Sequence, residues 1–367
     1  MRDARPDELA DWDAVTVEAP GGHVYQSTAW ADHRRPSGWQ PRFLVTADGG
    51  RVLALTRPWR FVGGSGAYLP RGPVPAGAGA TGATLAARQI AVTGVLAGDG
   101  VDVVAADPEV PASEGAYRAG ILRAGFRPID EIQPSRHRMT LPLDPGADEP
   151  AVLESITKST RQRIRSAERD GLMVIRHDRR IATDGAGEGF MPANEPPSAA
   201  LDRFYDLLLE TGERRRFFFG PRFSFVAWWM AALAAGHLIY LEARAPGAGE
   251  PLAGLVVYRH GGRLSTVHSG NHAVSRSEHP GALHLLRWRA IQLAIREGCV
   301  EMDLGGVDVH GSRGEPREGD PLYGLYQHKR AFGGRWLELT GAHERVLDPR
   351  GYALGRAAGR VSRLLRR

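Results

Sequence analysis

The sequence predicts an α+β protein made of two tandem units, each a mixed, twisted sheet flanked by helices. Two observations support this prediction. The chain has 367 residues, more than the length of one ordinary domain, and its hydrophobic content of 42% is enough for ordinary globular cores. A third is decisive, because the same order of three strands, a helix and a strand recurs in both halves. We place the first unit at residues 1–145, completed by 346–367, and the second unit at 146–345.

The second half shows this order most clearly. It contains expected strands at 237–243, 252–259 and 263–269, an expected helix at 282–297 and an expected strand at 299–304. Gly261 and Gly262 separate two of the strands as a hairpin turn would. The helical segment is apolar on almost every face and stops at Gly298, which is typical of a buried helix with a glycine end.

The first half repeats the pattern. Its expected strands are 41–47, 51–57 and 66–70, followed by an expected helix at 82–97 and an expected strand at 101–106. Matching elements start close to 200 residues apart, although few amino acids are identical between the copies. A three-strand meander followed by a helix and a strand resembles the acyltransferase fold of the GNAT type, so we expect two GNAT-like domains.

Two stretches interrupt this order. Pro, Gly and Asp cluster at 141–150, as in a linker between domains, and the irregular stretch 179–200 predicts a surface loop in the second unit. Between them we expect one helix at 151–169 with Lys158, Arg161, Arg165 and Arg169 opposite its apolar stripe. This basic face has two interpretations: a solvated surface, or a contact with the phosphates of a nucleic acid or another anionic substrate.

Composition narrows the class of protein. The net charge of +5 permits an anionic partner without demonstrating one, and Cys299 is the single cysteine, which excludes an intrachain disulfide and a cysteine-based zinc cluster. The N-terminal segment lacks an apolar signal sequence, and no apolar stretch reaches the roughly 18 residues that span a bilayer. We therefore expect a cytoplasmic protein with at most peripheral membrane contact.

The sequence gives no support for a bound cofactor or metal. GAGATG at 77–82 fits a dinucleotide fingerprint, but it follows Pro-Val-Pro rather than a strand, so a loop before a helix is the preferred interpretation and an acyl-CoA pyrophosphate loop the alternative. His268 and His272 are four residues apart at the end of a strand, where they would not share a helical face. We expect neither cofactor nor metal.

Two segments near the C-terminus carry residues suited to acyl transfer. Along the strand 299–304, Glu301 and Asp303 point to one side, where Asp303 could act as a base or, in the preferred interpretation, anchor backbone amides near Gly305. In the segment 321–341, Lys329 could stabilise an oxyanion beside a cleft or merely extend along a helix. Periodicity leaves both options for Lys329 open.

Motifs across nearly the whole chain resemble one family, the FemABX peptidyltransferases. They are HVYQSTAWADHRR at 23–35, YLPRGPV at 68–74, GFRPIDEIQP at 125–134, SITKSTRQRIRSAERDGLMV at 155–174, GCVEMDLGG at 298–306 and LYGLYQHKRAFGGRWLELTG at 322–341. The last is the most specific. The resemblance implies transfer of an amino acid from aminoacyl-tRNA to the amine of a peptidoglycan precursor, either UDP-MurNAc-pentapeptide or lipid II. It also implies a compact form without the coiled-coil arm.

The resemblance also assigns residues. Lys329 takes the role of stabilising the transition state, while Arg34 and Arg214 match the positions that bind precursor phosphates. The remaining expected substrate-binding residues are Ser269, Asp303, Tyr323, Tyr326, His328 and Arg330. His328 departs from the family pattern, which has Phe at this position.

Three rival functions remain at the level of sequence. The GNAT-type fold also serves acyl-CoA-dependent transfer to a sugar or small amine, so fold alone does not fix the donor. A Fem-like enzyme could instead modify a natural product, and a catalytically silent protein could bind tRNA alone. The sequence leaves open the amino acid transferred, the acceptor amine, whether the precursor is soluble or lipid-linked, and the oligomeric state.

Overall fold

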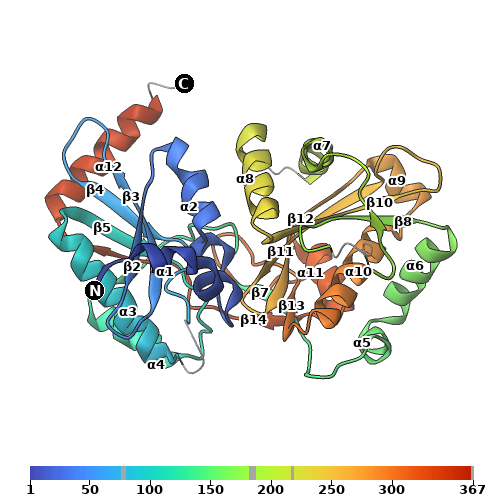
Figure 1. The fold of residues 1–367 in the computed structure, drawn as a ribbon, viewed down its shortest axis with the longest axis horizontal. Coiled ribbons are helices and arrows are strands. Elements are labelled where there is room, and N and C mark those ends of the chain that lie inside the picture. The colour runs from blue at the N-terminus through green and yellow to red at the C-terminus, as the bar shows by residue number, and fades with distance from the viewer. Residues whose placement is uncertain (76–79, 182–186, 216–218, 365–367) are drawn as a thin grey trace. The chain divides into compact units, whose positions relative to one another are not determined.

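The computed structural model describes residues 1–75, 80–181, 187–215 and 219–364, which form two compact units (Figure 1). Unit 1 contains Met1–His137, Asp308–Gly314 and the chain from Leu337 onward, and unit 2 contains Arg138–Val307 and Glu315–Trp336. In the described residues each unit is built around one mixed sheet.

Unit 1 has the strand order β1-β2-β3-β4-β5-β15-β6 among its described residues. Its strands are β1 (Arg2–Asp3), β2 (Gln40–Val45), β3 (Arg51–Pro58), β4 (Ser65–Leu69), β5 (Val101–Ala106), β6 (Arg127–Pro128) and β15 (His343–Val346). Its helices are α1 (Pro6–Ala10), α2 (Thr28–Arg34), α3 (Gly82–Gly98), α4 (Gly115–Arg123) and α12 (Pro349–Leu364). Strands β4 and β5 are parallel with α3 between them in sequence, and the other neighbouring pairs are antiparallel.

Alternating side chains build a core on each face of this sheet. Val52 and Ala54 of β3 pack in one cluster with Val92 and Leu96 of α3, whereas Leu53 joins Trp12 and Ala31 on the opposite face. The period of two in β3 therefore explains why both faces are covered.

Unit 2 has the strand order β14-β7-β13-β12-β11-β10-β8-β9 in its described part. Its strands are β7 (Arg138–Pro142), β8 (Met173–His177), β9 (Met191–Pro192), β10 (Leu238–Arg244), β11 (Ala253–His260), β12 (Arg263–Asn271), β13 (Glu301–Asp303) and β14 (Arg335–Leu337). Its helices are α5 (Glu149–Ser155), α6 (Lys158–Arg169), α7 (Pro197–Arg215), α8 (Arg222–Ala234), α9 (Ala273–Glu278), α10 (Ala282–Arg296) and α11 (Tyr323–Ala331). The β12–β13 pair is parallel, with α10 between the two strands in sequence.

The faces of this second sheet also differ in a regular way. Leu255 and Val257 of β11 belong to the large core that includes Leu286 and Ile291 of α10. The opposite face carries Tyr258, whose hydroxyl accepts a hydrogen bond from Trp228 Nε1 of α8 at 2.6 Å. Helices α7 and α8 lie over that face of the strands (Figure 1).

The repeated order of elements predicted from the sequence is confirmed. Each expected strand and helix of the repeat has a counterpart in the structure, and the observed ends differ from the expected ends by no more than two residues. Strand β13 is shorter than expected. The third antiparallel strand is followed by a helix and a parallel strand in both sheets. Beyond this repeat, the chain exchanges strands: β7 pairs with β13, and β15 returns from the C-terminal region to lie between β5 and β6.

Three expectations differ from the structure. The single helix expected at 151–169 is wrong, because Ile156 is extended with ψ 141° and separates α5 from α6. Part of the expected linker at 141–150 is already structured, since Leu141 and Pro142 belong to β7. The stretch 179–200 includes β9 and the start of α7 at Pro197, and residues 182–186 lie outside the described residues.

Candidate functional site

Strands β12 and β13 separate inside the sheet of unit 2. They pair only from Arg263 with Glu301 to Ser265 with Asp303, whereas β12 continues to Asn271 against β11. The chain leaves β12 at Gly305, whose φ of +81° lies in the left-handed region that glycine adopts readily. In unit 1 the corresponding pair stays together to Leu69 and Ala106. The separation is therefore specific to the second sheet. It begins at the C-terminal end of β13.

Asp303 fixes the turn at this separation. Its Oδ1 accepts the N–H of Gly305 at 2.7 Å, and its Oδ2 accepts a hydrogen bond from Arg138 Nη1 at 3.3 Å. The same Arg138 nitrogen also donates to Glu301 at 3.1 Å. A carboxylate held by a backbone amide and a guanidinium positions the turn, so these contacts favour the anchoring role of Asp303 over the role of a base.

Lys329 of α11 places its ammonium at the same turn. The side chain is 5% exposed, and Nζ donates to the carbonyl of Gly306 at 3.1 Å. A Cβ atom on Gly305 would lie 3.2 Å from Nζ, so the absence of a side chain there keeps the ammonium close to the backbone. The structure therefore brings together Lys329 and the turn that Asp303 anchors.

The other predicted residues of α11 do not converge on that turn. The hydroxyl of Tyr326 bonds Glu315, the Arg330 guanidinium lies 5.7 Å from the centroid of the Tyr326 ring, and Tyr323 stacks on the same ring at 6.2 Å. His328 contacts His284 of α10, with 4.8 Å between ring centroids. These contacts are those of a packed helix, and their roles in substrate binding stay predictions.

Strand β12 contributes two adjacent residues of different character. Ser269 is half-buried and pairs with Leu255 of β11. His268 lies against Phe219, Phe225 and Trp229, with ring centroids 5.6 to 6.3 Å apart. Burial in this apolar environment lowers the pKa of His268 to about 4, so its imidazole is neutral at physiological pH.

The Gln-Ser-x-x-Trp motif of unit 1 has a structural explanation. Gln26 is fully buried, its Oε1 accepts from Leu53 N at 2.8 Å, and its Nε2 donates to Pro70 O at 2.6 Å. Ser27 caps α2 by accepting the N–H of Trp30 at 2.9 Å. The motif therefore ties the start of α2 to the sheet.

Arg34 stands at the end of α2 among aromatic rings. Its guanidinium lies 5.3 Å from the centroid of Trp30 and 5.8 Å from that of Trp39, and Arg57 lies 5.6 Å from Trp39. Burial and then the charge of Arg57 lower the pKa of Arg34. A pocket of about 460 Å³ borders this group. It is lined by Pro36, Ser37, Gly38, Arg57, Pro58 and Arg60.

Arg214 was expected to share the task of Arg34. It belongs to the last turn of α7, but its side chain lies outside the described residues. Its assignment stays a prediction.

Sequence reasoning missed three residues of these sites. Arg138 links Asp303 to Glu301, and Arg57 with Trp39 completes the surroundings of Arg34. Arg138 has no local signal, because it reaches its partners across strands that are distant in sequence, whereas Arg57 meets Trp39 across the β2–β3 hairpin. Only the pairing of β7 with β13 could have indicated Arg138.

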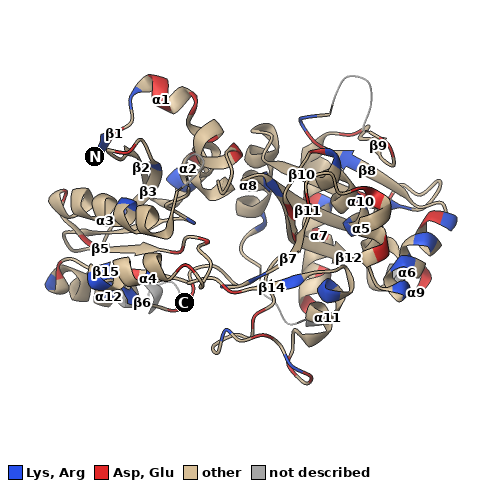
Figure 2. Cartoon of the chain, turned by 90° about the horizontal axis from the view of Figure 1, so that it is seen from below, with Lys and Arg blue, Asp and Glu red and all other residues tan. Residues whose placement is uncertain are grey.

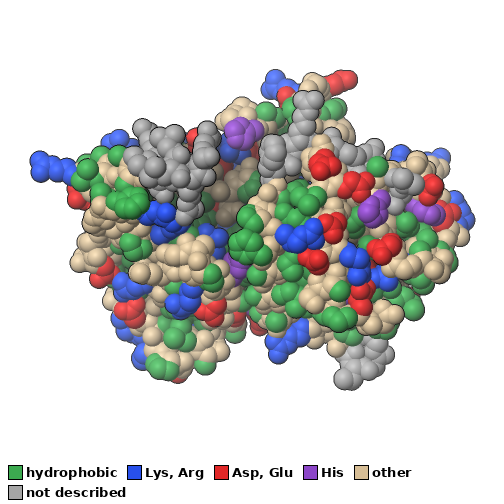
Figure 3. Space-filling model, turned by 90° about the horizontal axis from the view of Figure 1, so that it is seen from above, with side chains coloured by type: hydrophobic (Ala, Val, Ile, Leu, Met, Phe, Trp, Pro, Cys, Tyr) green, Lys and Arg blue, Asp and Glu red, His purple; other side chains and the backbone are tan. Residues whose placement is uncertain are grey.

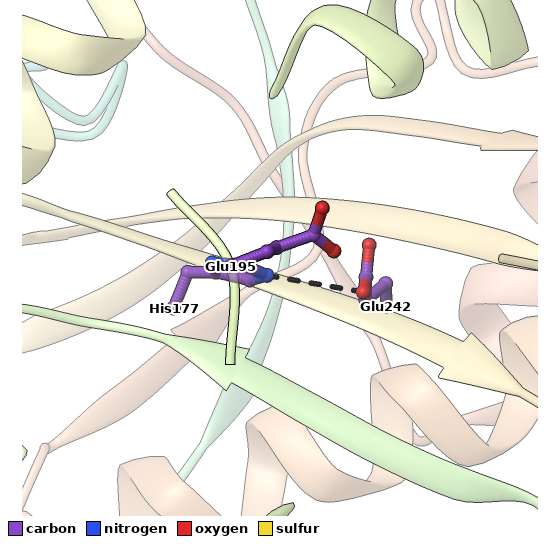
Figure 4. A group of neighbouring side chains, drawn as sticks. All are labelled: His177, Glu195 and Glu242. Carbon is purple, nitrogen blue, oxygen red and sulfur yellow. Dashed lines mark ion pairs between the residues drawn. The ribbon is translucent and has the colours of Figure 1, made fainter. Parts of the chain in front are cut away.

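Another polar cluster on unit 2 has a donor set that could suit a metal ion. Figure 4 shows His177, Glu195 and Glu242, whose ligand atoms lie within 4.8 Å of one another. Arg244, however, bonds both carboxylates, and Arg203 Nη2 lies 2.5 Å from Glu195 Oε1. A metal would have to displace these guanidinium groups, so the cluster is better explained as a salt-bridge network.

The basic face of α6 is less uniform than its sequence. Arg161 Nη1 donates to the carbonyls of Glu154 and Ile156, both at 2.6 Å, and so satisfies the end of α5. In the backbone drawing of Figure 2, basic residues lie along α6 together with acidic ones nearby. On the face drawn in Figure 3, basic and acidic side chains are interspersed as well. Within the described residues, no helix is both long and apolar enough to cross a membrane.

Comparisons with known proteins agree with this architecture. A model of the GNAT acetyltransferase domain matches residues 156–330. Lipid II:glycine glycyltransferase of Staphylococcus aureus (strain USA300) is 23% identical over 93% of this chain and 92% of its own length. A crystal structure of FemX superposes with a TM-score of 0.77 at 18% identity, covering 96% of this chain and 99% of that one. L-PGS of Bacillus licheniformis gives a TM-score of 0.51 at 12% identity, covering 100% and 98%.

These findings answer the question of fold and relationship. The two GNAT-like units expected from the internal repeat are confirmed, and the FemX superposition spans both of them. The resemblance of the motifs to the FemABX peptidyltransferases is confirmed by the match to the glycyltransferase over nearly the whole chain. The chain is therefore similar to a lipid II:glycine glycyltransferase over nearly its whole length, has the fold of FemX, and matches the GNAT acetyltransferase domain in its second half.

Proposed function

We propose that this protein is an aminoacyltransferase of peptidoglycan bridge formation in cell-wall synthesis. It moves an amino acid from aminoacyl-tRNA to the amine of a precursor stem peptide. The observation that carries this proposal is the ammonium of Lys329, held at the point where β12 and β13 separate. The glycyltransferase homologue, named for its action on lipid II, supports the acceptor class.

The proposed reaction is aminolysis of an ester. The acceptor nitrogen attacks the carbonyl carbon of the aminoacyl group, the carbonyl oxygen becomes an oxyanion, and collapse of this intermediate breaks the bond to the ribose oxygen. The attacking amine loses a proton, and the departing ribose oxygen gains one. Because the ester is already activated, positioning of the two substrates supplies much of the acceleration.

Lys329 stabilises the oxyanion in this scheme. An ammonium carries three N–H donors, one of which Gly306 accepts and holds in place. A donor fixed before the reaction stabilises developing negative charge without reorganisation, and losing one such donor typically costs about 10²-fold to 10³-fold in turnover. Asp303 acts here as a positioning residue, because it fixes the turn that Lys329 contacts.

Arg34 binds the acceptor in this proposal. Its guanidinium and that of Arg57 lie against the same Trp39 ring beside the pocket in unit 1. Two like charges this close repel, and a pyrophosphate between or beside them would relieve the repulsion through charge-assisted hydrogen bonds. UDP-MurNAc-pentapeptide and lipid II both carry such a group. Arg214 and the remaining predicted residues stay candidates for contacts with the acceptor or the donor.

A second candidate has one observation in its favour. The GNAT acetyltransferase model matches residues 156–330, and many acyltransferases of this fold use acyl-CoA. The same ammonium could stabilise the oxyanion of a thioester. Tests of function therefore have to compare the two donors directly.

The experiment offers both donors to the same acceptor. Total tRNA charged with radiolabelled amino acids, or acetyl-CoA, is incubated with the protein and either UDP-MurNAc-pentapeptide or lipid II, and products are identified by mass spectrometry. We expect the stem peptide to gain one aminoacyl residue, and we expect ribonuclease treatment of the donor to prevent this. Acetyl transfer without aminoacyl transfer would instead establish the acyl-CoA function.

A further inference from the structure

Arg287 of α10 differs from the other buried arginines. The residue is 4% exposed, and its Nε and Nη1 have no hydrogen-bond partner among the described residues. Burial lowers the pKa of Arg287 to about 10, so the guanidinium remains charged at neutral pH. A buried charge is retained at a high cost unless an opposite charge compensates it.

The other arginines buried in the described residues all have such compensation. Their shortest ion pairs are Arg88 with Asp48 at 2.9 Å, Arg138 with Glu301 at 3.1 Å, Arg176 with Asp178 at 2.5 Å, Arg259 with Glu297 at 2.6 Å and Arg263 with Glu301 at 3.6 Å. Within that described part, Arg287 has no carboxylate within 4.0 Å. The chain therefore pairs its buried guanidinium groups as a rule, and Arg287 is the exception that needs a separate explanation.

Arg287 lies beside a cluster of aromatic rings rather than beside an acid. Its guanidinium carbon lies 5.7 Å from the centroid of Phe332, which His284 stacks against at 5.9 Å. His328 contacts both rings, at 4.8 Å from His284 and 5.2 Å from Phe332. A cation–π contact with one Phe compensates only part of the cost of burying a charge. Because His284 and His328 are only half-buried, they form the exposed side of this group.

The surroundings of His284 also favour the binding of an anion. Burial and then the charges of Arg163 and Arg287 lower the pKa of His284 to about 4, which leaves the imidazole neutral. An approaching anion would be attracted by two guanidinium groups and could accept an N–H of this ring. The positive charges of Arg163 and Arg287, which help to lower the pKa of His284, would therefore also attract an anion.

We infer that Arg287, with His284, His328 and Phe332, forms a subsite for a phosphodiester of the RNA donor. Flat rings beside a guanidinium are the groups that proteins use to hold single-stranded RNA, stacking on bases while the charge binds the backbone. Here the half-buried His284 and His328 are the rings that a base could reach, since Phe332 is fully buried. This inference rests on the proposed function, because it assigns the RNA that the aminoacyl ester belongs to.

The position of the subsite fits the end of a donor strand. His328 and Lys329 are neighbours on α11, so the phosphodiester subsite and the proposed reaction centre share one helix. On the other side, α10 packs closely on α6, since a Cβ on Gly281 would lie 2.4 Å from the carbonyl oxygen of Arg163. The charge of Arg163 also contributes to the low pKa of His284, so this residue of α6 adjoins the subsite and could contact a nucleotide that precedes the 3′ end.

The test uses Arg287→Met, which removes the charge but keeps most of the volume. We expect its melting temperature in chloride buffer to equal or exceed that of the wild type, because an uncompensated charge is removed. Binding of a fluorescent single-stranded RNA ending in C-C-A should weaken about tenfold or more. The dependence of affinity on salt should fall by about one counterion, whatever the sequence of the RNA.

Arg289→Met is the matched control on the same helix. Arg289 already donates to Glu168 at 3.0 Å and to Gln292 at 2.6 Å, so this variant should retain the RNA affinity. A lower melting temperature of Arg287→Met with unchanged RNA affinity would overturn the inference and make Arg287 a structural cation.

Inorganic phosphate separates the subsite from the proposed function. Phosphate should raise the melting temperature of the wild type and not that of Arg287→Met. If the wild type transfers no amino acid but shows this difference, the anion subsite stands and the proposed function fails. If the wild type transfers amino acids while Arg287→Met binds RNA with the same affinity and salt dependence, the function stands and the subsite is refuted.

Discussion

At the scale of single residues, the identity of residue 329 is informative. Lysine occurs at only two positions, Lys158 and Lys329, although the chain has 47 basic residues. A composition so rich in arginine makes a buried lysine notable, since an ammonium is compact and a guanidinium is a wide planar fork. The limited space at Gly305 accommodates the former.

We therefore predict that Lys329→Arg does not preserve activity. The charge remains, but the larger group cannot occupy the place of Nζ beside the Gly306 carbonyl without moving the turn. Turnover should fall at least tenfold in steady-state transfer assays, as expected for misplacing an oxyanion donor. Wild-type turnover of this variant would show that only the charge matters.

Gly305 offers an independent probe of the same geometry. Gly305→Ala places a Cβ 3.0 Å from the carbonyl oxygen of Thr266 and 3.2 Å from Lys329 Nζ, on a backbone with φ +81°. We expect kcat to fall more than KM rises, because the displaced turn no longer holds the ammonium. Gly319→Ala is the control, since its φ is also positive but, in the described part of the chain, no atom beyond its two sequence neighbours would lie within 4 Å of the added Cβ. An equal loss in both variants would contradict this account.

At the scale of elements, buried ion pairs join strands and helices of unit 2. Asp178, at the end of β8, lies 2.7 Å from Arg259 of β11 and 2.5 Å from Arg176, while Arg259 also contacts Glu297 after α10 at 2.6 Å. Burial alone would raise the pKa of Asp178, but its bonds with Arg259 and Arg176 outweigh this and lower it.

We predict that Asp178→Asn lowers the free energy of unfolding by about 3 kcal/mol in urea titrations, because two buried guanidinium groups lose a charge partner. The exposed Asp206, which pairs with Arg222, is the matched control, and Asp206→Asn should change stability by less than about 0.5 kcal/mol. Since the folded-state pKa of Asp178 is lowered, its contribution is present above pH ~4 and lost as pH falls through the folded pKa. The difference between wild type and Asp178→Asn should therefore shrink in acid.

The elements also show what local sequence patterns can and cannot predict. The strands β10 to β12 and helix α10 were predictable because their periodicity and glycine turns are local signals. The break at Ile156 was not, because its apolar side chain fits the helical stripe and the break depends on Arg161 bonding the carbonyls at the end of α5. Lys329 was found through its motif, whereas Arg287 could not be recognised, because only tertiary packing shows that it is buried without an acid.

At the scale of the whole molecule, the chain exchanges strands between its two sheets. Strand β15 lies between β5 and β6, and Leu347 and Asp348 donate to the carbonyl of Asp102 at 2.7 and 3.1 Å. Residues near the C-terminus thus complete a sheet that begins at residue 2. Unit 1 therefore depends on the last part of the chain.

Truncation tests this dependence. Ending the chain at Ala342 removes β15 and exposes the edge of β5, and we expect insoluble protein or loss of cooperative unfolding of unit 1. Ending it at Asp348 retains β15 and removes α12, and we expect soluble protein with lower stability. The measurement is limited proteolysis with mass spectrometry, and resistance of unit 1 in the shorter chain would contradict the account.

The most direct test of the central claim is the single-turnover rate of aminoacyl transfer by Lys329→Ala. With saturating aminoacyl-tRNA and precursor, we expect a rate at least about 10²-fold below that of the wild type, because the oxyanion loses its fixed donor. Donor affinity and melting temperature should stay close to those of the wild type. A folded Lys329→Ala protein that transfers the amino acid at the wild-type rate would contradict the account.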